Sequence, residues 1–377
     1  MKVPVATPLF SSEVATNISA ALKDKAISGL FGNQLLEFEQ GFAKFCGTKY
    51  AITCSSGTSA LHLAMAGYGI KKGDEVLVSS LTNMATFFAV LYLGAIPVPV
   101  DIDLDTLNID YKDLKKKISS KTKAIMVVHL FGHPVDMHPI LEIANKMNIP
   151  VFEDCAEAHG AEYKGQKVGS LGKAGCFSFF ANKILTTGEG GMVTTDDEEL
   201  AFKVKSLKSL AFGNKDKFQH ADIGYNYRMT NIQAAIGCEQ VKNAELLINK
   251  RIEIANFYFN ELKKFSDYIL FPQEKPYAKN VYWMYHMVLN PKEKLYKLRE
   301  NILSDLDKVG IETRQGFVPF NLQKIFIGKN LTKPEDCPVA ALTSSASFYI
   351  PSGPDISKEE LDYVVLNFST ILEKYIY

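Results

Sequence analysis

A lysine beside a glycine-rich turn is the residue of this sequence best placed for covalent chemistry. Lys183 follows the largely apolar run 176–181 and precedes the glycine-rich segment 188–191. Desolvation disfavours an ammonium ion and lowers the pKa of the amine, so that the amine can become a nucleophile. The ordinary alternative is a loop lysine whose charged end extends into water.

Acidic residues directly follow a candidate strand earlier in the chain. The apolar run 150–153 leads into Asp154 and, three residues later, Glu157. Ligands of parallel sheets lie at the carboxyl ends of the strands. A carboxylate there can hold the protonated nitrogen of a heterocycle, which is the partner that a pyridinium needs to act as an electron sink. An acidic helix N-terminus, favoured by the helix dipole, explains the same residues equally well.

A turn of small residues follows another candidate strand, at 51–54. It contains Ser56, Gly57 and Thr58 and leads into a helical pattern. Free N–H groups at a helix start, with hydroxyls beside them, suit a phosphate group. Taken alone, a routine helix capped by serine or threonine is the more ordinary interpretation. It is not a Walker A loop, because no Gly-Lys-Ser/Thr follows.

The elements that must position these residues alternate between strands and helices from about residue 50 to 200. Such an alternation, with strands that are almost continuously apolar, predicts a mostly parallel sheet covered on both faces. Prolines at 97 and 99 favour an edge position for the strand that contains them. Strands are expected at 51–54, 75–78, 96–100, 124–128, 150–153, 176–179 and 191–195, and helices at 59–68, 86–93 and 139–147.

The pattern changes after residue 230 and predicts a smaller α+β domain. A long helical stretch covers 231–265, with at most a brief interruption near Asn243. It is followed by a strand at 284–289, a helix at 297–309, a strand around 311–313 and a C-terminal helix from Lys358. We therefore expect a large domain over residues 12–240 and a small C-terminal domain over 241–377, with the segment 1–11 packing nearby.

The composition indicates a globular protein that acts on small molecules. The chain has 377 residues, of which 47% are hydrophobic and 22% charged, and its 42 Lys and Arg balance 42 Asp and Glu. This balance predicts neither a nucleic-acid nor a membrane partner. The six cysteines are scattered, without metal-ligand spacing, which favours no metal site and a reducing, cytoplasmic compartment.

Five segments together resemble a known family. They are 57–64, 94–98, 153–158, 178–191 and 224–231. The residues of these segments and their order are similar to those of the fold-type I aminotransferases, specifically the sugar-nucleotide aminotransferases of DegT/DnrJ/EryC1/StrS type. The similarity covers nearly the whole chain. Within this family, the runs 157–161 and 179–183 are most similar to GDP-perosamine synthases.

The resemblance implies an α/β fold with a large domain that binds pyridoxal 5'-phosphate. Lys183 would hold this cofactor as a Schiff base, and Asp154 would pair with its pyridine nitrogen. Glu157 would lie near the 3'-oxygen of the ring. Asn226 would reach the phosphate of the neighbouring subunit's cofactor, so that a homodimer would share its active sites. The phosphate would be held by the small residues Ser56, Gly57, Thr58 and Ser178.

The sequence departs from the family pattern at two positions. Asn83 stands where the family usually has an aromatic residue that stacks on the pyridine ring, and Phe87 is a candidate replacement. Arg314 matches an arginine of the small domain, but Asn321 stands where the family often has a histidine. These last two residues, together with His159, are the candidates for contact with the substrate.

The implied reaction is a ping-pong transfer of an amino group. The donor would be L-glutamate and the acceptor a keto sugar nucleotide such as GDP-4-keto-6-deoxymannose, in the biosynthesis of a cell-surface polysaccharide such as capsule or O-antigen. The alternative acceptor is a small phosphorylated ketone such as dihydroxyacetone phosphate, to which the two departures point. A sugar dehydratase of the same scaffold would carry histidine in place of Lys183. A non-catalytic regulatory protein would have little need for Lys183, Asp154 and the phosphate turn together.

Overall fold

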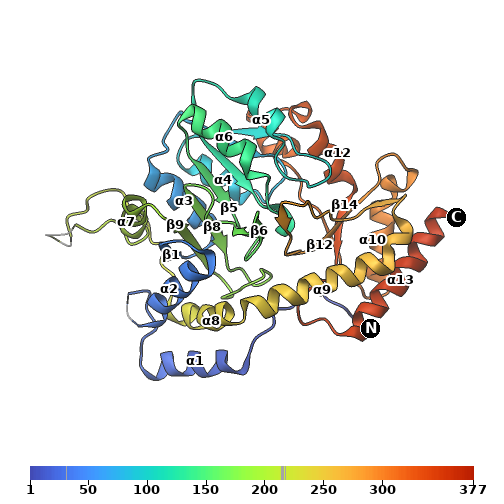
Figure 1. The fold of residues 1–377 in the computed structure, drawn as a ribbon, viewed down its shortest axis with the longest axis horizontal. Helices are drawn as coiled ribbons and strands as arrows, with labels where there is room; N and C mark the ends of the chain where they lie inside the picture. Colours follow the sequence, from blue (N-terminus) through green and yellow to red (C-terminus); the bar gives the residue numbers. More distant parts are fainter. Residues whose placement is uncertain (31, 214–215, 217) are drawn as a thin grey trace.

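The computed structural model describes residues 1–377 apart from 31, 214–215 and 217, and its centre is a sheet of seven strands (Figure 1). Neighbouring strands pair in parallel from β8 to β3, whereas β9 is antiparallel to both β8 and β1. The sheet is thus mostly parallel, as predicted. In spatial order its strands are β1 (Tyr50–Cys54), β9 (Gly191–Thr195), β8 (Ala174–Ser178), β5 (Val151–Asp154), β4 (Thr122–Val128), β2 (Glu75–Ser79) and β3 (Ile96–Val100).

Helices cover both faces of this sheet. Buried residues of α3, α4 and α7 share one apolar cluster with the strands, and those of α5 and α6 share another. Helix α2 packs near β1, and α1 lies along α8. The bounds are α1 (Ser12–Lys23), α2 (Gln34–Cys46), α3 (Gly57–Tyr68), α4 (Ala85–Tyr92), α5 (Tyr111–Lys117), α6 (Met137–Met147), α7 (Glu198–Leu207) and α8 (Asn231–Lys242).

The prediction of an edge strand with two prolines is confirmed. Strand β3 pairs only with β2 among the described strands, so one side of it needs no ladder donors. Proline lacks the backbone N–H that an interior strand must donate, and an edge strand tolerates this loss.

A second, four-stranded antiparallel sheet lies in the C-terminal part. Its order is β10 (Ile269–Leu270), β12 (Tyr285–Leu289), β14 (Ser347–Ile350) and β13 (Arg314–Gln315). The helices of this part are α9 (Ala244–Leu262), α10 (Arg299–Lys308), α11 (Lys324–Ile327), α12 (Pro338–Ala346) and α13 (Lys358–Ile376).

Two features tie this part to the rest of the chain. The long α9 follows α8 after a break at Asn243 and runs along the molecule toward α10 and α13 (Figure 1). A small sheet joins β11 (Ala278–Lys279) to β6 (Glu162–Tyr163), which in turn pairs with β7 (Gln166–Lys167). The division at residue 240 remains a prediction, although the break at Asn243 is close to it.

The strand predicted around 311–313 is displaced in the structure. Ile311 makes an isolated parallel bridge to Val3, and the strand of the sheet begins at Arg314. The reason is the N-terminal segment: the carbonyl of Val3 accepts from the N–H of Glu312, and the N–H of Val3 donates to Gly310. Ile311 therefore pairs outside the four-stranded sheet.

Among the described residues, no helix is both long enough and apolar enough to cross a membrane.

Candidate active site

A pocket of about 330 Å³ opens at the carboxyl ends of the parallel strands. It gathers seven of the predicted site residues: Ser56, Gly57, Thr58, Asp154, Glu157, Ser178 and Lys183. The other residues that line it are Leu61, Thr82, Asn83, Ala85, Val128, Ala156, Phe180, Asn182, Glu189, Trp283, Phe317 and Tyr349. A neighbouring cavity of about 390 Å³ shares none of these residues and has a mostly apolar lining, so the chemistry belongs to the smaller pocket.

The turn at the start of α3 forms one end of the pocket. Ser56 caps the helix: its hydroxyl accepts from the N–H of Ser59 at 3.1 Å, and the Ser59 hydroxyl accepts from the N–H of Ser56 at 2.9 Å. A Cβ added at Gly57 would lie 2.8 Å from that of Ser178, so glycine allows the helix start to approach β8. The first N–H groups of a helix have no partner within it, and here they stand beside hydroxyl groups.

Asp154 ends β5 and is 5% exposed. Its Oδ2 accepts from the Thr86 hydroxyl at 2.8 Å, and its Oδ1 accepts from the N–H of Ala156 at 3.1 Å. Burial raises the pKa of Asp154, and these two hydrogen bonds and the nearby Lys183 partly oppose the rise. A cation placed against this carboxylate would offset the cost of burying its charge.

The amine of Lys183 lies deep in the pocket. Its Nζ is 4.0 Å from Oε1 of Glu157 and 3.7 Å from the centre of the Trp283 ring. Burial lowers the pKa of Lys183, against the opposing influence of the carboxylates of Glu157 and Asp154. The amine is therefore more readily neutral, and more nucleophilic, than that of a solvated lysine.

Glu157 shares this environment. Burial raises its pKa to about 7, although Lys183 and a hydrogen bond from the N–H of Phe131 favour its charged form. That hydrogen bond reaches Oε2 at 2.8 Å and leaves Oε1 directed toward the lysine. A carboxyl group of this kind can hold or release a proton near neutral pH.

The three predicted substrate contacts lie outside the pocket. His159 is fully buried among Phe42, Phe177 and Phe179, so it is a core residue and the prediction of a substrate contact is corrected. Asn321 is also fully buried, and its Nδ2 donates to the carbonyl of Pro334 at 2.7 Å.

The third residue, Arg314, is exposed and pairs with Glu312. It does not line the pocket, but its strand neighbour Tyr349 does. Asn226 is exposed and does not line the pocket of its own chain. Its backbone forms an isolated antiparallel β-bridge with Ser209.

The proposal that Phe87 replaces the missing ring-stacking residue is wrong. Phe87 is fully buried and stacks on Phe320, with 4.0 Å between the ring centres. On α4 it is Thr86 that faces Asp154, and the next residue of a helix points about 100° away from it. Asn83 does line the pocket, and its Oδ1 accepts from the N–H of Ala85 at the start of α4.

Thr86, Trp283 and Asn182 belong to the site but carried no prediction. Thr86 comes to Asp154 from a distant helix, and Trp283 reaches Lys183 from the segment before β12. Asn182 precedes Lys183 in the run 179–183, and its buried Oδ1 has no hydrogen-bond partner among the described residues. Of these three, Asn182 could have been found from the sequence, through its place next to the lysine.

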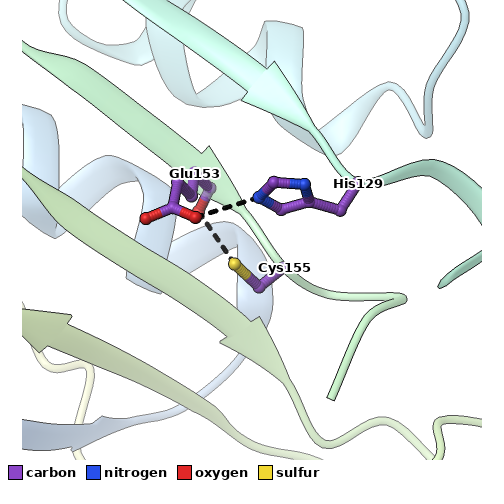
Figure 2. Close-up of side chains that lie close together, drawn as sticks. All are labelled: His129, Glu153 and Cys155. Carbon is purple, nitrogen blue, oxygen red and sulfur yellow. Dashed lines mark hydrogen bonds and ion pairs between the residues drawn. The ribbon is translucent and has the colours of Figure 1, made fainter. Parts of the chain in front are cut away.

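Behind the site, His129, Glu153 and Cys155 form a cluster of potential ligand atoms that lie within 4.8 Å of one another (Figure 2). The N–H of Val135 donates to Nδ1 of His129, so the proton of the ring is on Nε2, which donates to Glu153 at 3.0 Å. Neither ring nitrogen keeps a free lone pair for a metal ion.

The other two groups of the cluster, Glu153 and Cys155, are also poorly suited to bind a metal ion. The Glu153 carboxylate accepts further hydrogen bonds from the backbone N–H groups of Gly169, Leu171 and Gly172. Burial raises the pKa of the Cys155 thiol well above its usual value, which opposes the thiolate that metals require. The cluster fixes the segment after β4 that carries Phe131.

Comparison with known proteins identifies this arrangement. The model of the DegT/DnrJ/EryC1/StrS aminotransferase family matches residues 9–369. The chain belongs to this family. The aminotransferase is 38% identical to the GDP-perosamine synthase of Caulobacter vibrioides over 371 residues, which cover 98% of each protein. It is 39% identical to the GDP-perosamine synthase of Escherichia coli O157:H7 over 362 residues, 96% of each protein.

The fold of the aminotransferase is also that of solved relatives. An aminotransferase from Psychrobacter cryohalolentis superposes with a TM-score of 0.91 at 31% identity, and 98% of each chain is covered. The predicted fold class is therefore confirmed. The aminotransferase is a transferase that uses pyridoxal 5'-phosphate, as its family does.

The residues of the pocket fit this cofactor. The start of α3 beside Ser178 offers backbone N–H and hydroxyl donors for a phosphate. Asp154 is a buried carboxylate without a cationic hydrogen-bond partner among the described residues, which suits a protonated ring nitrogen. Lys183 supplies a buried amine in the same pocket.

Proposed function

We propose that this aminotransferase moves an amino group from L-glutamate to a keto sugar nucleotide such as GDP-4-keto-6-deoxymannose, in the biosynthesis of a cell-surface polysaccharide. The observation that carries the proposal is the convergence of Lys183, Asp154 and the start of α3 on one pocket. The choice of acceptor is supported by the similarity, over nearly the full length, to two GDP-perosamine synthases.

Each residue of the pocket has a distinct role in this proposal. Pyridoxal phosphate, when bound, supplies an electron sink for the negative charge left when a carbon loses a proton. Asp154 keeps the ring nitrogen protonated, and the turn of α3 with Ser178 binds the phosphate. Lys183 Nζ would act as base and then acid: it would move a proton from the α-carbon of glutamate to the cofactor and, in the second half of the reaction, from the cofactor to the former carbonyl carbon of the acceptor. Trp283 and Phe317 exclude water around this amine.

Of the two residues that favoured a small phosphorylated ketone as the acceptor, one no longer does so. Its case rested on Asn83 and Asn321 as altered substrate contacts. Asn321 is fully buried, and its amide donates to the carbonyls of Pro334 and Cys337, so its identity reflects packing rather than the acceptor. Asn83 remains in the pocket, where an amide can bind a hydroxyl of either kind of acceptor.

We further propose a homodimer in which Asn226 completes the partner's site. Asn226 is exposed and lies outside its own pocket, although the family resemblance assigns it to the cofactor phosphate. Large apolar side chains are exposed on the same part of the chain and on or near α1 and α2, and a partner subunit would remove them from water. Ile223 is 82% and Phe218 81% exposed, and Leu22, Leu30 and Leu36 are each more than half exposed.

A panel of acceptors tests the proposed function. The purified protein, loaded with pyridoxal phosphate, would be given glutamate together with GDP-, dTDP- or UDP-linked 4-keto-6-deoxy sugars or dihydroxyacetone phosphate. Formation of 2-oxoglutarate and of the amino sugar is followed by mass spectrometry. The proposal predicts the highest kcat/KM for a sugar nucleotide. A higher kcat/KM for dihydroxyacetone phosphate would overturn it.

A further inference from the structure

The ring of Trp283 lies against the amine of Lys183. The distance from Nζ to the ring centre is 3.7 Å, and Trp283 is the single tryptophan of the chain. An ammonium ion over an indole face is attracted by the electrons of the ring, and the attraction is stronger where water is excluded. Both side chains are largely buried, since Trp283 is 3% exposed and the Lys183 side chain 11%.

Trp283 is held in place from three segments, through its ring and its backbone. Its Nε1 donates to the carbonyl of Asn182 at 2.9 Å, which ties the ring to the residue before the lysine. Its backbone N–H donates to the carbonyl of Phe131 at 3.0 Å. Its carbonyl accepts from the buried guanidinium of Arg251 on α9. The indole therefore has little freedom to leave the amine.

Strained backbone flanks this arrangement. Phe131 has a φ of 52° and Tyr282 a φ of 46°, in the left-handed region that bulky residues rarely adopt. Such conformations persist where the surrounding structure imposes them, and they gather at functional sites. Through its strained residue, the segment 130–132 presents the N–H of Phe131 to Glu157 and its carbonyl to Trp283. One segment thus places both neighbours of the amine.

We propose that Trp283 is a positioning residue that binds the ammonium form of Lys183 once this amine, free of the cofactor, has taken up a proton. The indole face, 3.7 Å from Nζ, and the Glu157 carboxylate, 4.0 Å away, both stabilise this charge. These two contacts would keep the protonated amine in the pocket until it gives up its proton. The consequence for turnover depends on the proposed function, but the contact itself does not.

Other charged or titratable groups near the amine of Lys183 also affect its protonation, some favouring and some opposing the ammonium form. The carboxylates of Asp154 and Glu157 favour its protonated form, and the guanidinium of Arg251 opposes it. Burial keeps two further groups uncharged: it lowers the pKa of His159 to about 3 and raises that of Tyr349 to about 12. Glu189 lines the pocket as well. The contribution of Trp283 must be separated from these by substitution of the ring alone.

Two substitutions isolate the ring face. Trp283→Leu removes the face and the indole N–H, whereas Trp283→Phe removes the N–H but keeps a smaller aromatic face. The extent of Lys183 labelling by an amine-reactive reagent would be measured against pH, by mass spectrometry of the peptide, in the full chain loaded with pyridoxamine 5'-phosphate. This cofactor form leaves the lysine amine free, and no substrate is needed.

The proposal predicts that Trp283→Leu lowers the labelling midpoint by about half to one and a half pH units, because the ammonium loses its partner. Trp283→Phe should shift it by less than half as much. An unchanged or raised midpoint in Trp283→Leu would overturn the proposal, as would equal shifts in the two variants.

The fluorescence of Trp283 provides a second measurement that leaves the ring intact. Because no other tryptophan contributes, the pH dependence of the emission reports on the charge at this ring. The wild-type chain, without cofactor, should show a transition at the labelling midpoint of Lys183 in the same form, and Lys183→Met should lose it. Glu157→Gln separates the titration of that carboxyl. A transition at the labelling midpoint that survives in Lys183→Met would contradict the proposal, whatever the acceptor of the enzyme proves to be.

Discussion

The Oδ2 of Asp154 accepts a hydrogen bond of 2.8 Å from the hydroxyl of Thr86, and both side chains are buried. The bond connects the end of β5 to the first turn of α4. It favours the charged form of a carboxylate whose pKa burial raises. Thr86 thereby helps Asp154 to remain an anion that can hold a cationic ring.

We expect Asp154→Asn to lower kcat by about a hundredfold or more, because a neutral amide does not hold a pyridinium proton. Thr86→Val removes one hydrogen bond to the carboxylate and should lower kcat by about tenfold. Steady-state turnover at saturating cofactor measures both. Thr343→Val is the matched control, since this buried hydroxyl donates to Val339 within α12 and should be neutral. Near wild-type turnover in Asp154→Asn would show that another group partners the ring.

His159 provides a test of its corrected role through the pH dependence of stability. Burial lowers its pKa to about 3, from 6.5 in the unfolded chain. Between these values the unfolded state binds a proton that the folded state does not, so the free energy of unfolding falls as the pH drops below 6.5.

His159→Phe removes this dependence. Between about pH 8 and about pH 5 the variant should lose about 2 kcal/mol less than the wild type, as measured by chemical denaturation. His138→Phe, at an exposed position, is the control and should keep the wild-type slope. An unaltered slope in His159→Phe would mean that the folded protein can protonate this ring.

Mixing of variants tests the shared site. Lys183→Ala and Asn226→Asp are each expected to be inactive, the second because a carboxylate repels the phosphate. If Asn226 acts in the partner's site, a hybrid dimer contains one intact site, and an equal mixture should recover about a quarter of the wild-type activity. Activity after joint refolding measures the recovery. A mixture that stays inactive would place Asn226 in its own chain's site or outside any site.

How much the sequence could predict depends on where each partner stands in the chain. Lys183, Asp154 and the turn at Gly57 each adjoin a strand end, and a parallel sheet brings such ends together. The local sequence pattern was therefore enough to predict that these residues lie in one site. The edge position of β3 could be predicted for a similar reason, because its prolines exclude an interior strand.

Contacts between distant segments could not be predicted in this way. Thr86 and Trp283 lie far in sequence from Asp154 and Lys183, and only the tertiary fold joins them. Phe87 was misassigned because the sequence does not show which side of α4 faces the pocket. His159 was misassigned because a histidine beside a functional motif can equally well fill an aromatic core, as it does here.

The identity of the reacting lysine tests the central claim most directly. The protein would be loaded with pyridoxal phosphate, reduced with borohydride and digested, and turnover of glutamate with GDP-4-keto-6-deoxymannose would be measured in parallel. Lys173→Ala is the control, because the ammonium of Lys173 pairs with Asp197 away from the pocket. The account predicts a pyridoxyl group on Lys183, turnover in the wild type and in the control, and none in Lys183→Ala with the cofactor still bound. A pyridoxyl group on another lysine, or full turnover in Lys183→Ala, would contradict it.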